Sequence, residues 1–265
     1  MLVPFRALRP VVVLVASTAG MLLLLLAAPL RRLGVRFDGA VTRGWARLML
    51  ATYGVRVTVE GEPFVEPGIV VCDHVSYWDI VCLLAVQPGF FVSKASVKSW
   101  PVLGWGARLL PTIFIDRSRG AAATEQLERE ARALLDGGRH VVVFPEGTTS
   151  ARPCRRFKRG AFHVARVAGR PIHPMALLYD RMERFAWVGD DSFAPHLLRM
   201  TFDGGARCAL RRLPPIVSGD DEPAEAIAAR ARRAVQAAVD DLGRGFAREA
   251  AAPRADARET ERTPC

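Results

Sequence analysis

The stretch VVCDHVSYWDIV, residues 70–81, places an acid and an imidazole directly after a run of apolar, strand-forming residues. The apolar run ends at Cys72, so His74 is expected at the carboxyl end of a strand. In open α/β sheets this is the edge at which ligands bind. The stretch therefore predicts both a buried strand and a polar site at its end.

A helix is expected to begin directly after this strand end. Ser76 is a candidate cap for a helix starting at Tyr77, which places Asp79 in the first turn. From there the carboxylate can reach back to His74, fix its tautomer and stabilise the imidazolium. A polar strand end with a simple helix cap is the alternative interpretation. If the pair is catalytic, the absence of a nucleophile motif makes the imidazole a base for a substrate hydroxyl or a water.

Apolar strand-like runs alternate with helical patterns from Val55 onward. Such alternation predicts an α/β layered domain with a largely parallel central sheet flanked by helices. The runs that we expect to form strands are residues 55–61, 68–72, 89–95, 112–117, 140–147 and 171–178.

Helical periodicity marks the segments between and after these strands. Residues 121–136 and 159–168 carry apolar side chains at helical spacing, and acids before a proline in residues 220–223 predict the start of a last helix. The predicted α/β domain therefore covers residues 54–243. The tail, residues 244–265, is rich in Ala, Arg and Glu and is expected to be disordered.

The N-terminal region, residues 1–53, is predicted to form hydrophobic membrane-associated helices that precede the α/β domain. Residues 10–30 contain no charge, and as a helix they would extend roughly 31 Å, about one hydrocarbon core. A signal peptide is the competing interpretation. Residues 36–54 predict an amphipathic helix along a bilayer surface. Its apolar face comprises Val41, Trp45, Leu48 and Met49.

The formal net charge of +10 fits three classes of partner, namely nucleic acid, an anionic membrane and phosphorylated ligands. The cations are 34 Arg and only 3 Lys, and no zinc-finger or RNA-binding signature accompanies them, so we expect no nucleic-acid partner. The five cysteines are scattered without a Cys-x-x-Cys pair. This argues against a disulfide framework and against a zinc site.

Two other predicted strands also end in polar residues. FPEGTTS, residues 144–150, offers a glycine and three hydroxyl side chains in a turn suited to an anion. TIFIDRSR, residues 112–119, supplies a guanidinium that can hold a phosphate bidentately. A plain exit into a loop and an acid–arginine surface pair are the respective alternatives. The candidate binding residues are Arg117, Glu146, Gly147, Thr148 and Lys158, of which Glu146 is expected to accept from a hydroxyl or to pair with an arginine.

Four blocks in order and spacing resemble those of the glycerophospholipid acyltransferases. The blocks are HVSYWD (74–79), IFIDR (113–117), FPEGT (144–148) and PIHPMAL (171–177). Among these enzymes the pattern is similar to that of the bacterial 1-acyl-glycerol-3-phosphate (lysophosphatidic acid) acyltransferases. The resemblance covers about residues 68–178 and the N-terminal hydrophobic region.

The resemblance implies transfer of a fatty acyl group from acyl-CoA or acyl-carrier protein to the free sn-2 hydroxyl of 1-acyl-glycerol-3-phosphate, which gives phosphatidic acid. His74 would be the general base, Asp79 would orient it, and the candidate binding residues would hold the lysophospholipid acceptor. The resemblance further implies no metal or organic cofactor. It also implies a cell inner membrane location with the catalytic domain on the cytoplasmic face.

Three residues depart from the family pattern, and the departure at Thr149 leaves the acceptor head group open. Asp73 stands where the family often has Asn, Thr149 where many members carry Arg, and His173 at an often apolar position. Acylation of another lyso-lipid, such as lyso-ornithine lipid, is therefore an alternative. A non-catalytic membrane protein that binds lipid is the alternative from a different class.

Overall fold

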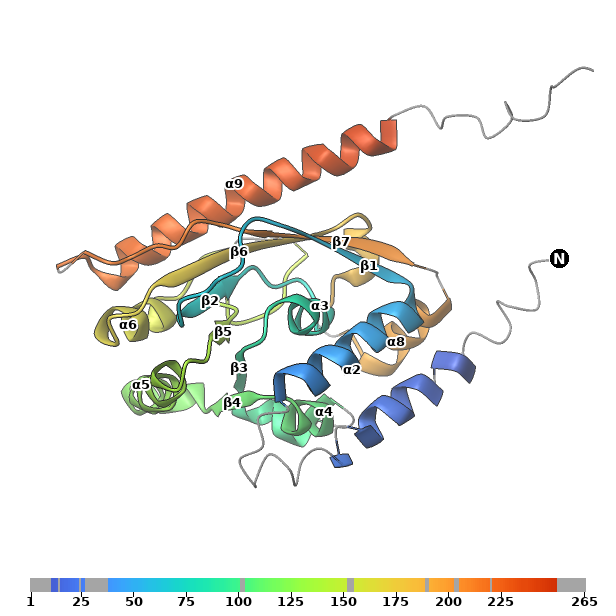
Figure 1. Ribbon diagram of the computed structural model, residues 1–265, viewed down its shortest axis with the longest axis horizontal. Helices are drawn as coiled ribbons and strands as arrows, with labels where there is room; N and C mark the ends of the chain where they lie inside the picture. Colours follow the sequence, from blue (N-terminus) through green and yellow to red (C-terminus); the bar gives the residue numbers. More distant parts are fainter. Residues whose placement is uncertain are drawn as a thin grey trace, which may run out of the picture.

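Seven strands form a single mixed sheet in the order β1-β7-β6-β2-β5-β3-β4 in the computed structural model (Figure 1). The structure describes residues 11–13, 15–23, 25–26, 38–100, 103–151, 155–188, 191–202, 205–219 and 221–251. The strands are β1 Val55–Glu60, β2 Ile69–Cys72, β3 Phe90–Lys94, β4 Thr112–Ile115, β5 Val141–Val143, β6 Ile172–Tyr179 and β7 Ala206–Arg212.

The parallel part of the sheet confirms the predicted fold class. Strands β6, β2, β5, β3 and β4 run parallel, and β2 lies between β6 and β5 with Ile69 opposite both Val141 and Ile172. Strand β7 was not predicted; it pairs antiparallel with β6 and parallel with β1. Three of its seven residues are arginines, which mask the alternation of the buried Cys208 and Leu210. All six strands expected from the sequence are present.

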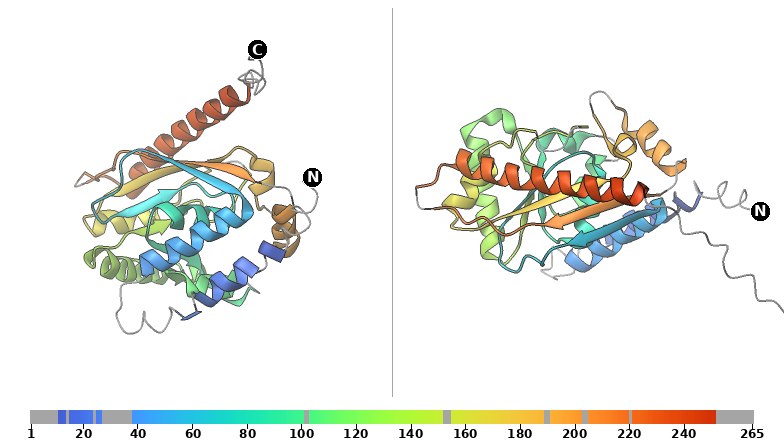
Figure 2. Two further views of the ribbon diagram at one scale, coloured as in Figure 1. Left: turned by 45° about the vertical axis from the view of Figure 1, so that its right-hand side comes forward. Right: turned by 90° about the horizontal axis from the view of Figure 1, so that it is seen from above.

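Helices cover both faces of the sheet. Successive residues of each strand point to opposite sides, so the strands place apolar side chains on both faces. Val70 faces a hydrophobic cluster that includes residues of α2 and α3, whereas Ile69 and Val71 face a second cluster with α5, α6 and α9 (Figure 2). The helices are α2 Asp38–Tyr53, α3 Trp78–Val86, α4 Leu103–Leu109, α5 Ala121–Asp136, α6 Gly160–Val167, α7 Met182–Phe185, α8 Phe193–Phe202 and α9 Ala224–Ala251; short 3-10 turns are η1 Ala95–Ser99 and η2 Arg117–Arg119.

The N-terminal region differs from the expectation in one respect. The described residues between 11 and 26, here called the N-terminal helical segment, are helical, but no helix among the described residues is long and apolar enough to cross a bilayer. Part of the predicted apolar run, including residues 27–30, lies outside the described residues. Helix α2 buries Met49 against the protein interior and leaves Leu48 41% exposed. The prediction that its apolar face lies along a bilayer is therefore wrong for Met49, which packs against the core instead.

The C-terminal boundary also differs from the prediction. Helix α9 continues through Ala251 rather than ending at residue 243. Its buried side includes Ile227, Val235 and Leu242, which pack in the cluster beneath β6. Beyond this contact, Arg207 of β7 lies over the ring of Phe246 and forms an ion pair with Glu249, so the last turns of the helix are held by the sheet. Residues 252–265 lie outside the described residues.

Candidate active site

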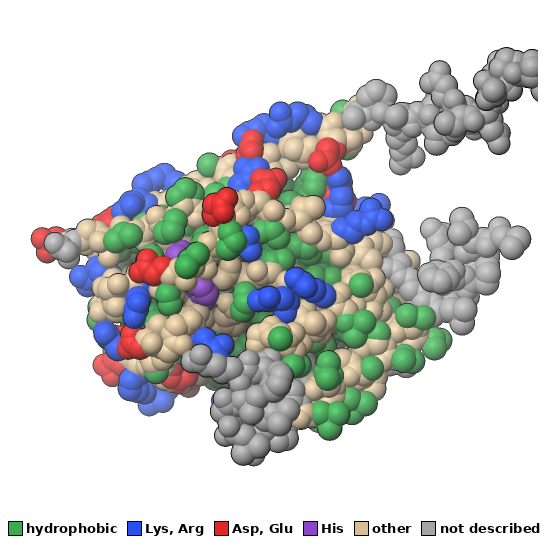
Figure 3. All heavy atoms as spheres, in the orientation of Figure 1, with side chains coloured by type: hydrophobic (Ala, Val, Ile, Leu, Met, Phe, Trp, Pro, Cys, Tyr) green, Lys and Arg blue, Asp and Glu red, His purple; other side chains and the backbone are tan. Residues whose placement is uncertain are grey.

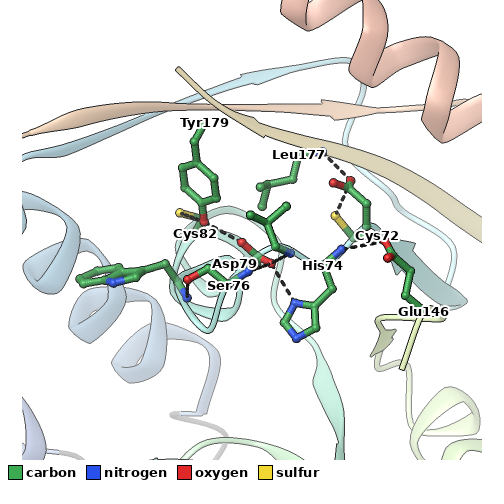
Figure 4. A network of polar contacts seen from close by, with 11 residues as sticks. Cys72, His74, Ser76, Asp79, Cys82, Glu146, Leu177 and Tyr179 are labelled. Atoms are coloured by element: carbon green, nitrogen blue, oxygen red, sulfur yellow. Dashed lines mark hydrogen bonds and ion pairs between the residues drawn. The ribbon is translucent and has the colours of Figure 1, made fainter. Parts of the chain in front are cut away.

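The predicted pair of imidazole and carboxylate is present at the carboxyl end of β2. His74 follows the strand, and its Nδ1 lies 2.8 Å from Oδ2 of Asp79, which stands in the first turn of α3 (Figure 4). The helix begins at Trp78, one residue later than expected, with Ser76 Oγ accepting from the Trp78 N–H at 3.3 Å. Because a carboxylate accepts from Nδ1, the other ring nitrogen, Nε2, remains a proton acceptor.

Four donors surround the carboxylate of Asp79, whose side chain is fully buried. Besides the imidazole, Oδ2 accepts from the backbone N–H groups of Val75 at 2.7 Å and Ser76 at 2.9 Å. The hydroxyl of Tyr179, at the end of β6, donates to Oδ1 at 2.7 Å. Burial of an ionised carboxylate is tolerated when its oxygens accept this many hydrogen bonds. The pattern both fixes the carboxylate and aims it at His74.

Tyr179 was not among the residues singled out from the sequence. It is 1% exposed, and its ring stacks on Phe185 with centroids 4.0 Å apart. Burial, reinforced by the adjacent charge of Asp79, raises its pKa well above the usual range, so the hydroxyl remains a donor. It lies 100 positions from Asp79 in the chain, and no local sequence motif predicts such a contact.

The residues after β5 contact both the backbone and the ring of His74. Glu146 is 5% exposed, and its Oε1 accepts from the backbone N–H of His74 at 3.2 Å. The N–H of Ser150 donates to the carbonyl of His74 at 3.0 Å. The ring of Phe144 stacks on the imidazole with centroids 3.9 Å apart. Glu146 therefore contacts the backbone of His74, and its expected contact with a ligand hydroxyl or an arginine stays a prediction.

Asp73 is a second buried carboxyl beside the dyad. It is fully buried, and its Oδ1 accepts from the N–H of Leu177 at 3.0 Å. Burial, together with the nearby charges of Asp79 and Glu146, raises the pKa of Asp73 well above the usual range. A neutral carboxyl at this position has the shape of the Asn side chain that the glycerophospholipid acyltransferases often carry there.

The imidazole opens onto an apolar cavity of about 640 Å³. The cavity is bounded by α2, α3, β3 and η1, by Trp187 and α8, and by the N-terminal helical segment. Trp45 and Met49 of α2, which the sequence assigned to a bilayer-facing surface, line this cavity instead. A cavity of this size with mainly apolar walls is suited to a long hydrocarbon chain.

Of the predicted binding residues, three line the same cavity as His74, namely Arg117, Gly147 and Thr148. Nη1 of Arg117 donates to the carbonyl of Gly147 at 2.7 Å. Gly147 has a φ of +79°, and a Cβ there would approach Lys158 Nζ to 2.7 Å and Arg117 Nη1 to 2.9 Å. The turn thus requires glycine and brings two cations together. Glu146 and Lys158 are not among the cavity-lining residues, although Lys158 adjoins the turn.

Comparisons with known proteins give the family. A family model described as Acyltransferase matches residues 56–178. The lyso-ornithine lipid O-acyltransferase of Pseudomonas aeruginosa is 33% identical over 75% of this chain and 78% of its own length. The chain belongs to the acyltransferase family.

Other similar proteins fall into two groups by acceptor. The lyso-ornithine lipid O-acyltransferase of Brucella abortus is 31% identical over 75% of this chain and 82% of its own length. The mouse 1-acyl-sn-glycerol-3-phosphate acyltransferase alpha is 34% identical over 67% of this chain and 62% of its own length. The crystal structure of the 1-acyl-sn-glycerophosphate acyltransferase from Thermotoga maritima shares the fold, with a TM-score of 0.56 and 22% identity over 87% of this chain and 97% of that chain.

The raised pKa of Asp73 predicts how the stability of this acyltransferase depends on pH. The folded state holds the Asp73 proton to higher pH than the unfolded state, so this residue lowers the free energy of unfolding as pH rises above about 3.9. Replacing Asp73→Asn removes that cost. We expect the variant to gain stability relative to wild type between pH 4 and pH 8, as measured by urea unfolding. A variant that is equally destabilised at both pH values would contradict a neutral Asp73.

Proposed function

We propose that this acyltransferase moves a fatty acyl group from an acyl thioester to the hydroxyl of a membrane lyso-lipid, with His74 as the general base. The observation that carries the proposal is the 2.8 Å contact between His74 Nδ1 and the buried Asp79 at the wall of an apolar cavity. This contact leaves Nε2 free to accept a proton, and the side chain of His74 retains 15% exposure. A purely structural histidine would not need a cavity at its ring.

In the proposed reaction, Nε2 of His74 takes the proton of the acceptor hydroxyl as its oxygen attacks the thioester carbonyl. Asp79 stabilises the imidazolium that forms. Collapse of the tetrahedral intermediate breaks the C–S bond, and the thiolate leaves with a pKa of about 8.5, which demands little acid assistance. The imidazolium then returns the proton to the thiolate. Coenzyme A and acyl-carrier protein are equally suited as the thiol, and these steps require no metal or organic cofactor.

For the acceptor, we propose lyso-ornithine lipid first and 1-acyl-glycerol-3-phosphate second. The chain covers 78% of the Pseudomonas enzyme named for the former but 62% of the mouse enzyme named for the latter. Arg117 already donates to the Gly147 carbonyl, and Thr149 adds no charge to the turn. A guanidinium missing at residue 149 weakens the case for a doubly charged phosphate, and this supports the lyso-ornithine acceptor. The proposed location is the cytoplasmic face of the inner membrane.

An assay of purified enzyme with one acyl thioester and both acceptors in detergent tests this proposal. We expect turnover with both acceptors to require the dyad, and kcat/KM to be higher for lyso-ornithine lipid. Preference for 1-acyl-glycerol-3-phosphate would overturn the acceptor assignment. Absence of turnover with either, together with unaltered lipid binding, would favour a non-catalytic lipid-binding protein.

His74→Ala is expected to lower kcat by at least about 100-fold, because general-base catalysis contributes about 10²–10⁴-fold. The matched control is His163→Ala, which removes a partly buried histidine of α6 that does not line the cavity. The control should keep near wild-type kcat in the same assay. Equal activity of the two variants would remove His74 from the mechanism.

Tyr179→Phe is expected to lower kcat by about tenfold, because it removes a hydrogen bond to a charged group. With one donor fewer, Asp79 should hold the His74 ring less firmly, so kcat should fall while KM changes little. Phe185→Leu is the control, since it disturbs the ring stacked on Tyr179 but keeps the hydroxyl. If Phe185→Leu lowers kcat as much as Tyr179→Phe does, Tyr179 has only a packing role.

A further inference from the structure

Helix α8 presents three different faces. His196 and Met200 are buried against the protein, and Phe193 and Leu197 line the cavity that contains His74. Leu198 and Phe202 project outward on a third face, at 57% and 64% exposure. They are four residues apart and therefore adjacent on the helix surface. The sequence-based interpretation left this helix without a role.

The position of α8 is fixed relative to the catalytic pair. Nδ1 of His196 lies 2.8 Å from the hydroxyl of Tyr77, the residue that precedes α3. The ring of Phe193 packs edge-on against the same tyrosine, with centroids 5.2 Å apart. Helix α8 thus forms part of the cavity wall through Phe193 and Leu197, and its outward face lies beside the cavity.

Other elements around the same cavity also expose large apolar side chains. On α4, Trp105 is 71% exposed next to Gly106, which lines the cavity. In the N-terminal helical segment, Met21 lines the cavity, while Leu26 is 74% exposed. Figure 3 shows hydrophobic side chains gathered at the end of the molecule where this segment lies in Figure 1. Single exposed leucines are ordinary on a protein, but a group around one cavity marks an interaction surface.

We propose that the exposed face of α8, formed by Leu198 and Phe202, docks on the surface of a bilayer that contains anionic lipid. The proposal rests on the proposed function, because a lyso-lipid with a long chain must pass from a membrane into the cavity. Aromatic side chains such as Trp105 prefer the interfacial region, and the exposed Arg108 and Arg199 flank the surface with positive charge. Helix α8 would thereby add a membrane contact to the one that the sequence leads us to expect for the N-terminal region.

The test compares the full chain with the double variant Leu198→Glu and Phe202→Glu in a vesicle sedimentation assay. Vesicles contain phosphatidylglycerol and phosphatidylethanolamine, with phosphatidylcholine vesicles as the uncharged comparison. Loss of two apolar side chains, and gain of two negative charges, should lower partitioning to the anionic vesicles by about tenfold or more. The control is Val65→Glu, which alters a 90% exposed side chain between β1 and β2. It should partition like wild type.

Turnover provides a second, independent measurement. The double variant should lose turnover with acceptor presented in vesicles but retain wild-type turnover with a short-chain acceptor in detergent, since neither residue lines the cavity. Partitioning equal to that of the Val65 control would overturn the proposal. The proposal would also be overturned if light scattering showed a dimer for the wild type and a monomer for the double variant. In that case a second copy of the chain, rather than a bilayer, would cover this face. A wild-type protein without any turnover would refute the proposed function and leave the partitioning result to decide on α8.

Discussion

The buried carboxylate of Asp79 is the constraint on which the site depends. An ionised carboxylate without partners would be expelled from an apolar interior or would bind a proton. Here two backbone N–H groups, an imidazole and a tyrosine hydroxyl satisfy it, at 2.7 to 2.9 Å. The backbone donors exist only because the chain turns sharply between β2 and α3. Local backbone geometry, rather than surface charge, therefore holds the imidazole in one orientation.

The parallel sheet brings the remaining parts together. Strands β2 and β5 are neighbours and end at one edge, so the turn after β5 reaches the backbone of His74 through Glu146 and Ser150. Strand β6, on the other side of β2, places the hydroxyl of Tyr179 within hydrogen-bond distance of Asp79. The apolar cavity then extends from this edge between α2, α3 and β3. In the proposed function the reacting hydroxyl meets the base where the polar edge joins the apolar cavity.

Patterns within a few residues were predictable from the sequence, whereas contacts between distant segments were not. The strand before His74, the helix after it and the pairing with Asp79 all lie within one short stretch of the sequence. Strand β7 escaped prediction because its arginines hid the alternation of its buried residues. The contact of Glu146 with a backbone N–H does not depend on the residue type of its partner, so the sequence could not indicate it. The contact of Tyr179 with Asp79 could be predicted only if the pairing of β6 with β2 were known.

In the proposed function, Asp79 holds His74 with the proton on Nδ1 and leaves Nε2 as the base. Nitrogen NMR of the five histidines, assigned with the His74→Ala variant, reports the tautomer directly. For the neutral imidazole of His74 we expect a protonated Nδ1 and an unprotonated Nε2, and loss of this preference in Asp79→Asn. A protonated Nε2 in the wild-type protein, or a tautomer indifferent to Asp79→Asn, would show that Asp79 does not orient the base.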